Sequence, residues 1–237
     1  MSGHSKWSTI KRQKEINDQV KGKIFTKLSL AISVAVKTGG GEDPETNPKL
    51  RAAIEAARSA NMPKENIEKA INKAKEKGNL EEVIYEGFGP SGIGVLVEVA
   101  TDNKNRTFQE IRNIFEKNEG NMATPGAVSY DFKQFGIIVV AKSENPDEQV
   151  LLLIDSGADD IQDVGHGFEL LVLFENINLV RNFLSQNNQK IISIDIVRKA
   201  NNPIKILDLK VCDKIKQLLN ALEEHDDVQK VFTNALI

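Results

Sequence analysis

Residues 136–199 carry the pattern that most restricts how this chain can fold. Four short apolar runs alternate with two amphipathic stretches, in the order strand, helix, strand, strand, helix, strand. The two central runs flank Gly165-His166-Gly167, a glycine pair typical of a hairpin turn. This order is the split β-α-β arrangement of ferredoxin-like sheets. The predicted strands are 136–141, 160–164, 168–174 and 191–197, and the predicted helices are 145–157 and 176–187.

The segments on either side of this unit predict a second sheet. Residues 93–100 form a buried apolar run, Thr107–Glu110 forms a capping box before a helix, and Ala127–Phe132 alternates like a strand. This β-α-β segment leaves an edge strand unpaired until an amphipathic helix at 208–224 and a strand at 228–235 are added. We therefore expect one domain to be inserted into another, with one continuous sheet as the alternative.

Before Gly78 the apolar residues recur at helical spacing. The first helix includes Ile24–Ala35, with Gly22 as a possible break, and ends at Gly39-Gly40-Gly41. Asn47-Pro48 and Asn61-Met62-Pro63 begin two more helices, because Asn caps a helix and Pro fits its first turn. These stretches predict a small helical bundle.

Together these patterns predict an α+β protein with an N-terminal helical bundle followed by two ferredoxin-like α/β domains, the third inserted in the second. The expected domains are a basic helical domain (1–78), a discontinuous α/β domain (79–132 plus 207–237) and an inserted α/β domain (133–206).

Charge is divided unevenly along the chain. Residues 1–78 contain 16 Lys and Arg against nine Asp and Glu, a net charge of +7, whereas the remaining residues contain 15 against 25, a net charge of −10. Solvated helix faces are the ordinary explanation of a lysine run. Here the excess is local, since residues 1–37 hold eight Lys and Arg against two acids. The asymmetry indicates an anionic partner at the amino-terminal end and leaves the acidic α/β domains for possible protein partners.

The amino-terminal cations are therefore the candidate nucleic-acid-binding residues. Spaced cations neutralise phosphates. Trp7 could stack on a base, or it could pack the start of the first helix. The candidate residues are His4, Lys6, Trp7, Lys11, Arg12, Lys14, Lys21, Lys23 and Lys27.

Other motifs have simpler explanations. Gly87–Gly92 matches G-x-G-x-x-G, but a β-branched strand follows it instead of a helix, so we predict a turn between strands. The acids Asp155, Asp159, Asp160 and Asp163 are expected to be solvated at a helix-to-strand turn, with acid–base catalysis as the alternative.

No residue set predicts a catalytic, cofactor or metal site. His166 is expected in a hairpin turn, Cys212 in a helix core, and His225 beside a helix C-terminus. One cysteine and three scattered histidines disfavour a disulfide framework or a metal centre. No apolar run reaches the roughly 18–20 residues of a membrane span, and no signal peptide is apparent, so we expect a cytoplasmic, non-enzymatic protein without cofactors or a small-molecule substrate.

Five segments resemble the YebC/PmpR family, which includes the mitochondrial translational activator of cytochrome c oxidase. The resemblance covers nearly the whole chain. It departs from the family at Glu119-Gly120-Asn121, where the family has a Gly-Gly pair, and at Asp131, where an apolar residue is usual. The segments are Gly3–Trp7 (GHSKW), Lys23–Leu28 (KIFTKL), Asn61–Lys64 (NMPK), Tyr85–Pro90 (YEGFGP) and Leu222–Gln229 (LEEHDDVQ).

The resemblance implies three domains, the third inserted in the second, and a DNA-binding transcriptional regulator in the cytoplasm. It equally implies a ribosome-associated translation factor that binds rRNA and relieves stalls at proline-rich stretches. The residues alone favour contact with a phosphate backbone or with rRNA, because the first region shows no recognition helix with side chains placed for base edges.

Overall fold

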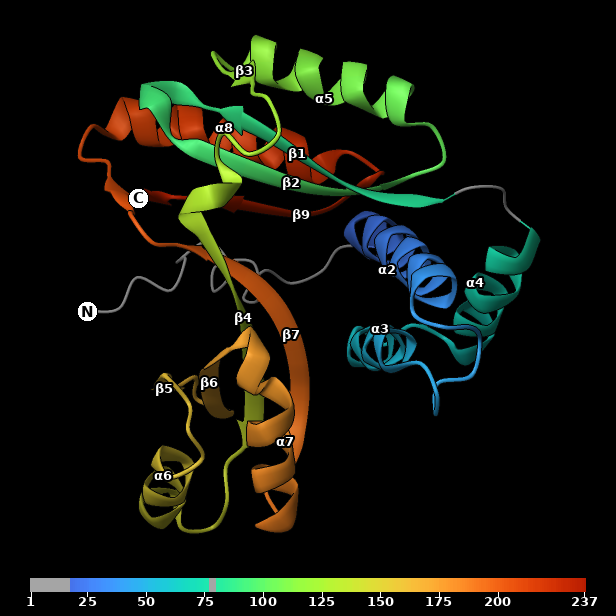
Figure 1. Ribbon diagram of the computed structural model, residues 1–237, viewed down its shortest axis with the longest axis vertical. Coiled ribbons are helices and arrows are strands. Elements are labelled where there is room, and N and C mark those ends of the chain that lie inside the picture. The colour runs from blue at the N-terminus through green and yellow to red at the C-terminus, as the bar shows by residue number, and fades with distance from the viewer. Residues whose placement is uncertain (1–17, 77–79) are drawn as a thin grey trace. The chain divides into compact units, whose positions relative to one another are not determined.

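The computed structural model describes residues 18–76 and 80–237, apart from a few side chains near the ends of the helical region. It forms two compact units (Figure 1). One contains the described residues up to Asp131 together with Ala200–Ile237, and the other contains Phe132–Lys199. The fold is α+β, as the sequence predicts. The boundaries of three separate domains stay a prediction.

Three helices form the amino-terminal part: α2 (Asp18–Thr38), α3 (Pro48–Ser59) and α4 (Lys64–Glu76). The predicted break at Gly22 is wrong, because α2 continues through it. Their shared core confirms the predicted apolar spacing, and most of it is small or aliphatic, which lets the helices approach closely. The buried members include Ile32, Leu50, Ile54, Ala57, Met62 and Ala70.

The buried Asn47 determines how α3 begins. Its side-chain oxygen accepts from Leu50 N at 3.0 Å, and its amide nitrogen donates to the carbonyls of Ala35 and Gly41 at 2.8 and 2.6 Å. The same side chain therefore caps α3 and satisfies a carbonyl near the end of α2. A Cβ at Gly39 would lie 2.1 Å from Asn47 Oδ1, so this turn requires glycine.

The first sheet has the order β3-β1-β2-β9. Antiparallel pairing joins β1 to both β3 and β2, and β2 to β9. The helices α5 and α8 cover one face of this sheet, as Figure 1 shows, and form a core with Tyr85, Val97 and Val99. A short parallel pair, β8 with β10, lies outside this sheet. The elements are β1 (Glu81–Phe88), β2 (Gly94–Thr101), α5 (Lys104–Lys117), β3 (Asn121–Met122), β8 (Ile204–Lys205), α8 (Leu209–Glu224), β9 (Val228–Thr233) and β10 (Ala235–Leu236).

The second sheet has the order β5-β6-β4-β7, and its elements follow one another as predicted. Both α6 and α7 pack on the same side, against a core that includes Ile138, Leu170 and Val172. This is the strand order of a ferredoxin-like sheet. The elements are β4 (Phe132–Ala141), α6 (Pro146–Ile154), β5 (Asp160–Asp163), β6 (Gly167–Leu173), α7 (Ile177–Gln186) and β7 (Ile191–Ala200).

The two sheets share one spatial plan but differ in how the chain runs through it. In the second sheet, α6 and β5 separate β4 from β6. In the first sheet, β1 leads directly to β2. The helix and edge strand that take the places of α6 and β5 are α8 and β9, and they come at the end of the chain. The first sheet is therefore a permuted version of the second.

The structure corrects the sequence prediction at three places. The strand predicted at 127–132 is wrong for residues 127–131, which form a turn and a 3₁₀ helix (Ser129–Asp131), and Phe132 already begins β4. The turn predicted at Gly87–Gly92 implies a strand before it, but the sequence pattern assigns no residues to that strand, which is β1. Helix α5 begins at Lys104 instead of Thr107, because the side chain of Asn103 accepts from Arg106 N and caps it.

The glycines of the Gly87–Gly92 motif allow close packing at a turn between β1 and β2, as expected. A Cβ at Gly87 would lie 2.6 Å from the Phe115 ring, and one at Gly89 would lie 2.8 Å from Leu218. The first glycine therefore gives α5 room against the sheet, and the second does the same for α8.

The buried carboxylate of Glu86 explains the turn before β4. It accepts from the backbone nitrogens of Gly126, Val128 and Ser129 at 2.8, 2.6 and 2.9 Å. Burial alone would raise the pKa of this carboxyl, but the three N–H donors outweigh burial and lower it. Because these N–H groups donate to Glu86, they are not available to pair with a neighbouring strand, and the predicted strand does not form here.

Asp131 joins the points where the chain leaves and re-enters the first unit. Its carboxylate accepts from the backbone and side-chain nitrogens of Asn202 at 3.2 and 2.6 Å, and its carbonyl accepts from Asn201 N at 2.7 Å. The polar side chain of Asp131 is therefore used in this structure, where the resemblance predicts an apolar residue.

We predict that Glu86→Gln lowers the free energy of unfolding by about 1–3 kcal/mol at pH 7, because one carboxylate oxygen becomes an amide that faces N–H donors. Since the folded pKa of Glu86 is lowered, its contribution is present at neutral pH and is lost as the pH falls below about 4. Urea unfolding between pH 7 and pH 3 measures the effect.

The matched control is Glu82→Gln on the same strand, where the exposed carboxylate lies 3.5 Å from Lys49 Nζ. It should change stability by less than about 0.5 kcal/mol. Equal losses for the two variants would show that the Glu86 contacts do not support the turn.

Candidate nucleic-acid interface

Most of the predicted nucleic-acid-binding residues lie outside the described part of the chain. Six of them, from His4 to Lys14, precede the first described residue. Lys21 and Lys23 lie on α2, but their side chains are not described. Their roles therefore stay predictions.

The remaining candidate, Lys27, has an intramolecular partner. Its Nζ donates to the carbonyl of Glu223 at 2.5 Å, in the last turn of α8. The carbonyls at the end of a helix have no partner within the helix and carry partial negative charge, so they attract an ammonium. This contact joins α2 to α8. A phosphate that binds Lys27 therefore competes with the Glu223 carbonyl for the ammonium group.

Other cations of the helical region are exposed. Lys69 and Lys73 are four residues apart on α4, so they share its outer face, and Arg58 lies in the last turn of α3. Within the described residues, none of these three side chains takes part in an ion pair or hydrogen bond. They extend the basic character of the amino-terminal segment onto the folded bundle.

The structure also assembles a polar cluster that the sequence analysis missed. Thr107 Oγ1 and Arg106 Nη2 donate to the same oxygen of Asp227, at 2.6 and 2.9 Å. The contributing segments, at the start of α5 and just before β9, are more than a hundred residues apart. The first segment contains the predicted capping box and the second belongs to a segment that resembles the family, but nothing in the sequence pairs the two.

His225 completes this cluster. Its Nδ1 accepts from Asp227 N at 3.2 Å, so the ring proton is assigned to Nε2, which lies 2.9 Å from Glu110 Oε2. A neutral ring satisfies both contacts. His225 is also the C-cap residue of α8, so it lies beside a helix C-terminus as predicted.

Electrostatics favour the charged forms of Arg106 and Asp227. Burial would raise the pKa of Asp227, but the hydrogen bonds from Thr107 and Arg106 and the nearby positive charge outweigh burial and lower it. The hydrogen bond from Arg106 to Asp227 in turn raises the pKa of the guanidinium. The pair fixes α5 against β9.

The same cluster has the ligand types of a metal site. One atom each of Glu110, His225 and Asp227 lies within 4.8 Å of the others. However, the Arg106 guanidinium already donates to Asp227 and lies 3.8 Å from Glu110. Because a cationic side chain occupies the position of the positive charge, these residues do not fit a metal ion without rearrangement.

The alternative enzyme hypothesis gains no support from the acids near Asp159. Asp159 accepts from Leu173 N at 2.8 Å, and Asp163 pairs with Lys142 at 2.8 Å. The hydrogen bond from Lys142 lowers the pKa of Asp163, whereas a general acid or base at neutral pH needs a raised one. As predicted, Cys212 is buried on α8.

The fold and its clusters define a protein with a basic helical bundle and two related α/β sheets. A model described as the TACO1/YebC protein N-terminal domain matches residues 5–77, and one described as the TACO1/YebC second and third domain matches residues 80–235. The chain belongs to this family. Within the described residues, no helix has the length and apolar character needed to span a membrane.

Full-length relatives support this assignment. A probable transcriptional regulatory protein of Syntrophomonas wolfei is 42% identical over 100% of this chain and 97% of its own length. One of the same description from Dictyoglomus thermophilum is 46% identical, over 99% of this chain and 95% of its own. The crystal structure of a conserved hypothetical protein from Aquifex aeolicus has a TM-score of 0.85 at 41% identity, covering 98% of this chain and 97% of the other.

We predict that Asp227→Asn lowers the free energy of unfolding by about 1–3 kcal/mol at pH 7, because a charged acceptor of two hydrogen bonds is lost. Since the folded pKa of Asp227 is lowered, the difference from the wild type should shrink as the pH falls below about 4. Chemical unfolding followed by far-UV circular dichroism measures it. The exposed neighbour Asp226 offers the control Asp226→Asn, and an equal loss there would contradict a specific role for the cluster.

Proposed function

We propose that this protein is a non-enzymatic, nucleic-acid-binding regulator whose basic amino-terminal region contacts phosphates. The observation that carries the proposal is the division of charge, +7 over residues 1–78 against −10 over the rest. The exposed Arg58, Lys69 and Lys73 support it, because they are available to an anionic partner. The relatives named probable transcriptional regulatory proteins favour DNA as that partner.

A second candidate is a ribosome-associated translation factor that binds rRNA. The family description includes TACO1, and the resemblance implies a role in translation. On the outer face of α4, the exposed polar side chains are mainly Lys and Glu, with Asn72 among them. Such a surface suits backbone contact better than base recognition.

Salt dependence tests phosphate contact by either candidate. If about five cations release counterions, the logarithm of the binding constant should fall with the logarithm of salt concentration at a slope of about −4.5 for duplex DNA. Filter binding between 50 and 300 mM salt measures this slope. A slope near zero would contradict the proposal.

The triple variant Lys11→Ala, Arg12→Ala and Lys14→Ala should weaken binding to all nucleic-acid sequences alike and reduce the slope by about 3. The matched control removes the same charge elsewhere, at the exposed residues Lys205, Lys210 and Lys216. Equal weakening in both variants would show that net charge, not the amino-terminal region, controls binding.

Gradient sedimentation of lysate, with and without ribonuclease, separates the two candidates. A translation factor should co-sediment with ribosomes and leave that fraction after digestion. A transcription regulator should stay at the top of the gradient and protect a defined promoter segment in footprinting.

A further inference from the structure

Acidic side chains concentrate in one stretch of the second unit. Residues 143–180 contain nine Asp and Glu and no Lys or Arg. A uniform charge of this kind repels nucleic acid and attracts cationic surfaces. This stretch includes α6, and its charge is opposite to that of the basic amino-terminal region.

Helix α6 presents two large apolar side chains among these acids. Leu151 is 66% exposed and Ile154 is 58% exposed, three residues apart and thus on one face. The buried side of the helix is made by Gln149 and Leu153. At 100° per residue, the outward face centres on Leu151, and its other members are Asp147, Glu148 and Asp155, all exposed.

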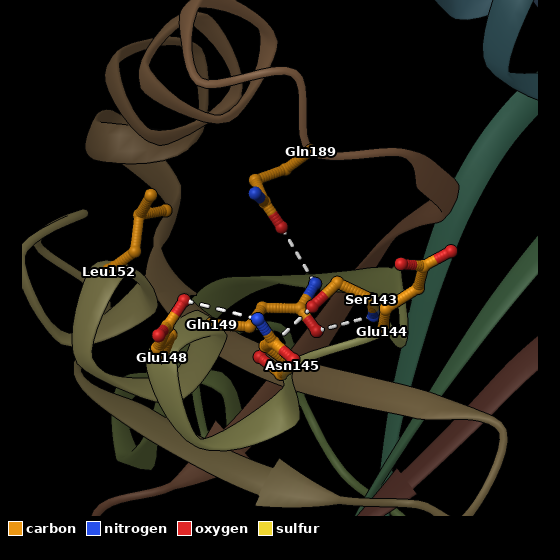
Figure 2. Close-up of a pocket in the computed structure, with 7 residues that line it drawn as sticks. All are labelled: Ser143, Glu144, Asn145, Glu148, Gln149, Leu152 and Gln189. Atoms are coloured by element: carbon orange, nitrogen blue, oxygen red, sulfur yellow. Dashed lines mark hydrogen bonds between the residues drawn. The ribbon is translucent and has the colours of Figure 1, made fainter.

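An open depression of about 400 Å³ adjoins this face at the start of α6 (Figure 2). Its shape depends on the buried Gln149, which donates to the Ala141 carbonyl at 2.8 Å and to Gln189 Oε1 at 2.7 Å, and accepts from Ser143 N at 2.8 Å. Because all these contacts are internal, Gln149 is structural. Glu144 and Glu148 supply the charge of the depression, and Glu148 also belongs to the outward face of α6.

We propose that this acidic face, defined as Glu144, Asp147, Glu148, Leu151, Ile154 and Asp155, docks a partner protein through a segment that carries Lys or Arg beside apolar side chains. A cationic side chain enters the depression near Glu144 and Glu148, while an apolar one covers Leu151 and Ile154. The opposite charges select the partner, and the apolar contact supplies much of the affinity. A second copy would bring acid against acid on this face, and nucleic acid would bring phosphate against carboxylate.

The inference is independent of the proposed nucleic-acid binding. It concerns a different unit and the opposite charge, so either can fail without the other.

The first test uses the full chain and a fluorescein-labelled 15-residue peptide with Lys and Leu at helical spacing. Anisotropy titration should show binding, and a Glu-for-Lys version of the peptide should not bind. The variant Leu151→Ala with Ile154→Ala should weaken binding about tenfold, because it removes most of the apolar contact. Both side chains are exposed, so the fold is retained, which circular dichroism verifies.

The matched control is Leu179→Ala on α7, since Leu179 is 63% exposed in the same unit. It should leave affinity within about twofold of the wild type. Amide chemical-shift changes on adding the peptide should map to α6 and to residues 143–149. The proposal is overturned if no binding is seen up to 1 mM, if both variants weaken binding equally, or if the shifts map elsewhere.

A second test identifies the partner in cells. A photoreactive amino acid at Ser143, an exposed position lining the depression, should give an adduct to a Lys- or Arg-rich segment of another protein. The adduct should disappear in the Leu151→Ala, Ile154→Ala background. An adduct to nucleic acid or to a second copy of this chain, an adduct that survives in that background, or no adduct would each count against the proposal.

Discussion

The pairing of β2 with β9 is the constraint on which the first unit depends. Val95 lies opposite Thr233 and Val99 opposite Val228, although more than a hundred residues separate the two strands. Closing so long a loop costs conformational entropy, which the core between α5, α8 and the sheet must offset. The contacts of Asp227 with Arg106 and Thr107 fix the same closure at the surface. The second unit can occupy the intervening chain because Asp131 holds the exit close to Asn202 at the return.

The two proposals assign different partners to the basic amino-terminal region and to the acidic face of α6. Cations at the amino-terminal end match a polyanion, and the acids around α6 repel one. The relatives' names refer to transcriptional regulation, and one way to regulate is to link nucleic acid to other machinery. A chain with a phosphate-binding region and a separate protein-docking face would provide such a link, whether the nucleic acid is DNA or rRNA.

Where the sequence predictions failed, a tertiary contact replaced a local one. Ala127–Phe132 alternates like a strand, but Glu86 takes the backbone N–H groups of Val128 and Ser129. The apolar pattern does not indicate strand β1, because Glu81, Glu82 and Glu86 interrupt it. Thr107 looked like a helix cap, yet its hydroxyl donates to Asp227. For Glu86 and Thr107 the partner lies too far along the chain for periodicity to reveal it.

The sequence by itself determined the class of fold, the order of elements in the second unit and the division of charge. Apolar spacing, caps and glycines act over a few residues, and the number of Lys, Arg, Asp and Glu residues in each segment can be counted without a structure. Only the tertiary structure decided the permuted order of the first sheet, the cluster around Asp227, and the outward position of Leu151 and Ile154 among acids. These depend on which distant segments pack together, because a strand edge or a carboxylate acquires its role from the partner that the fold places beside it.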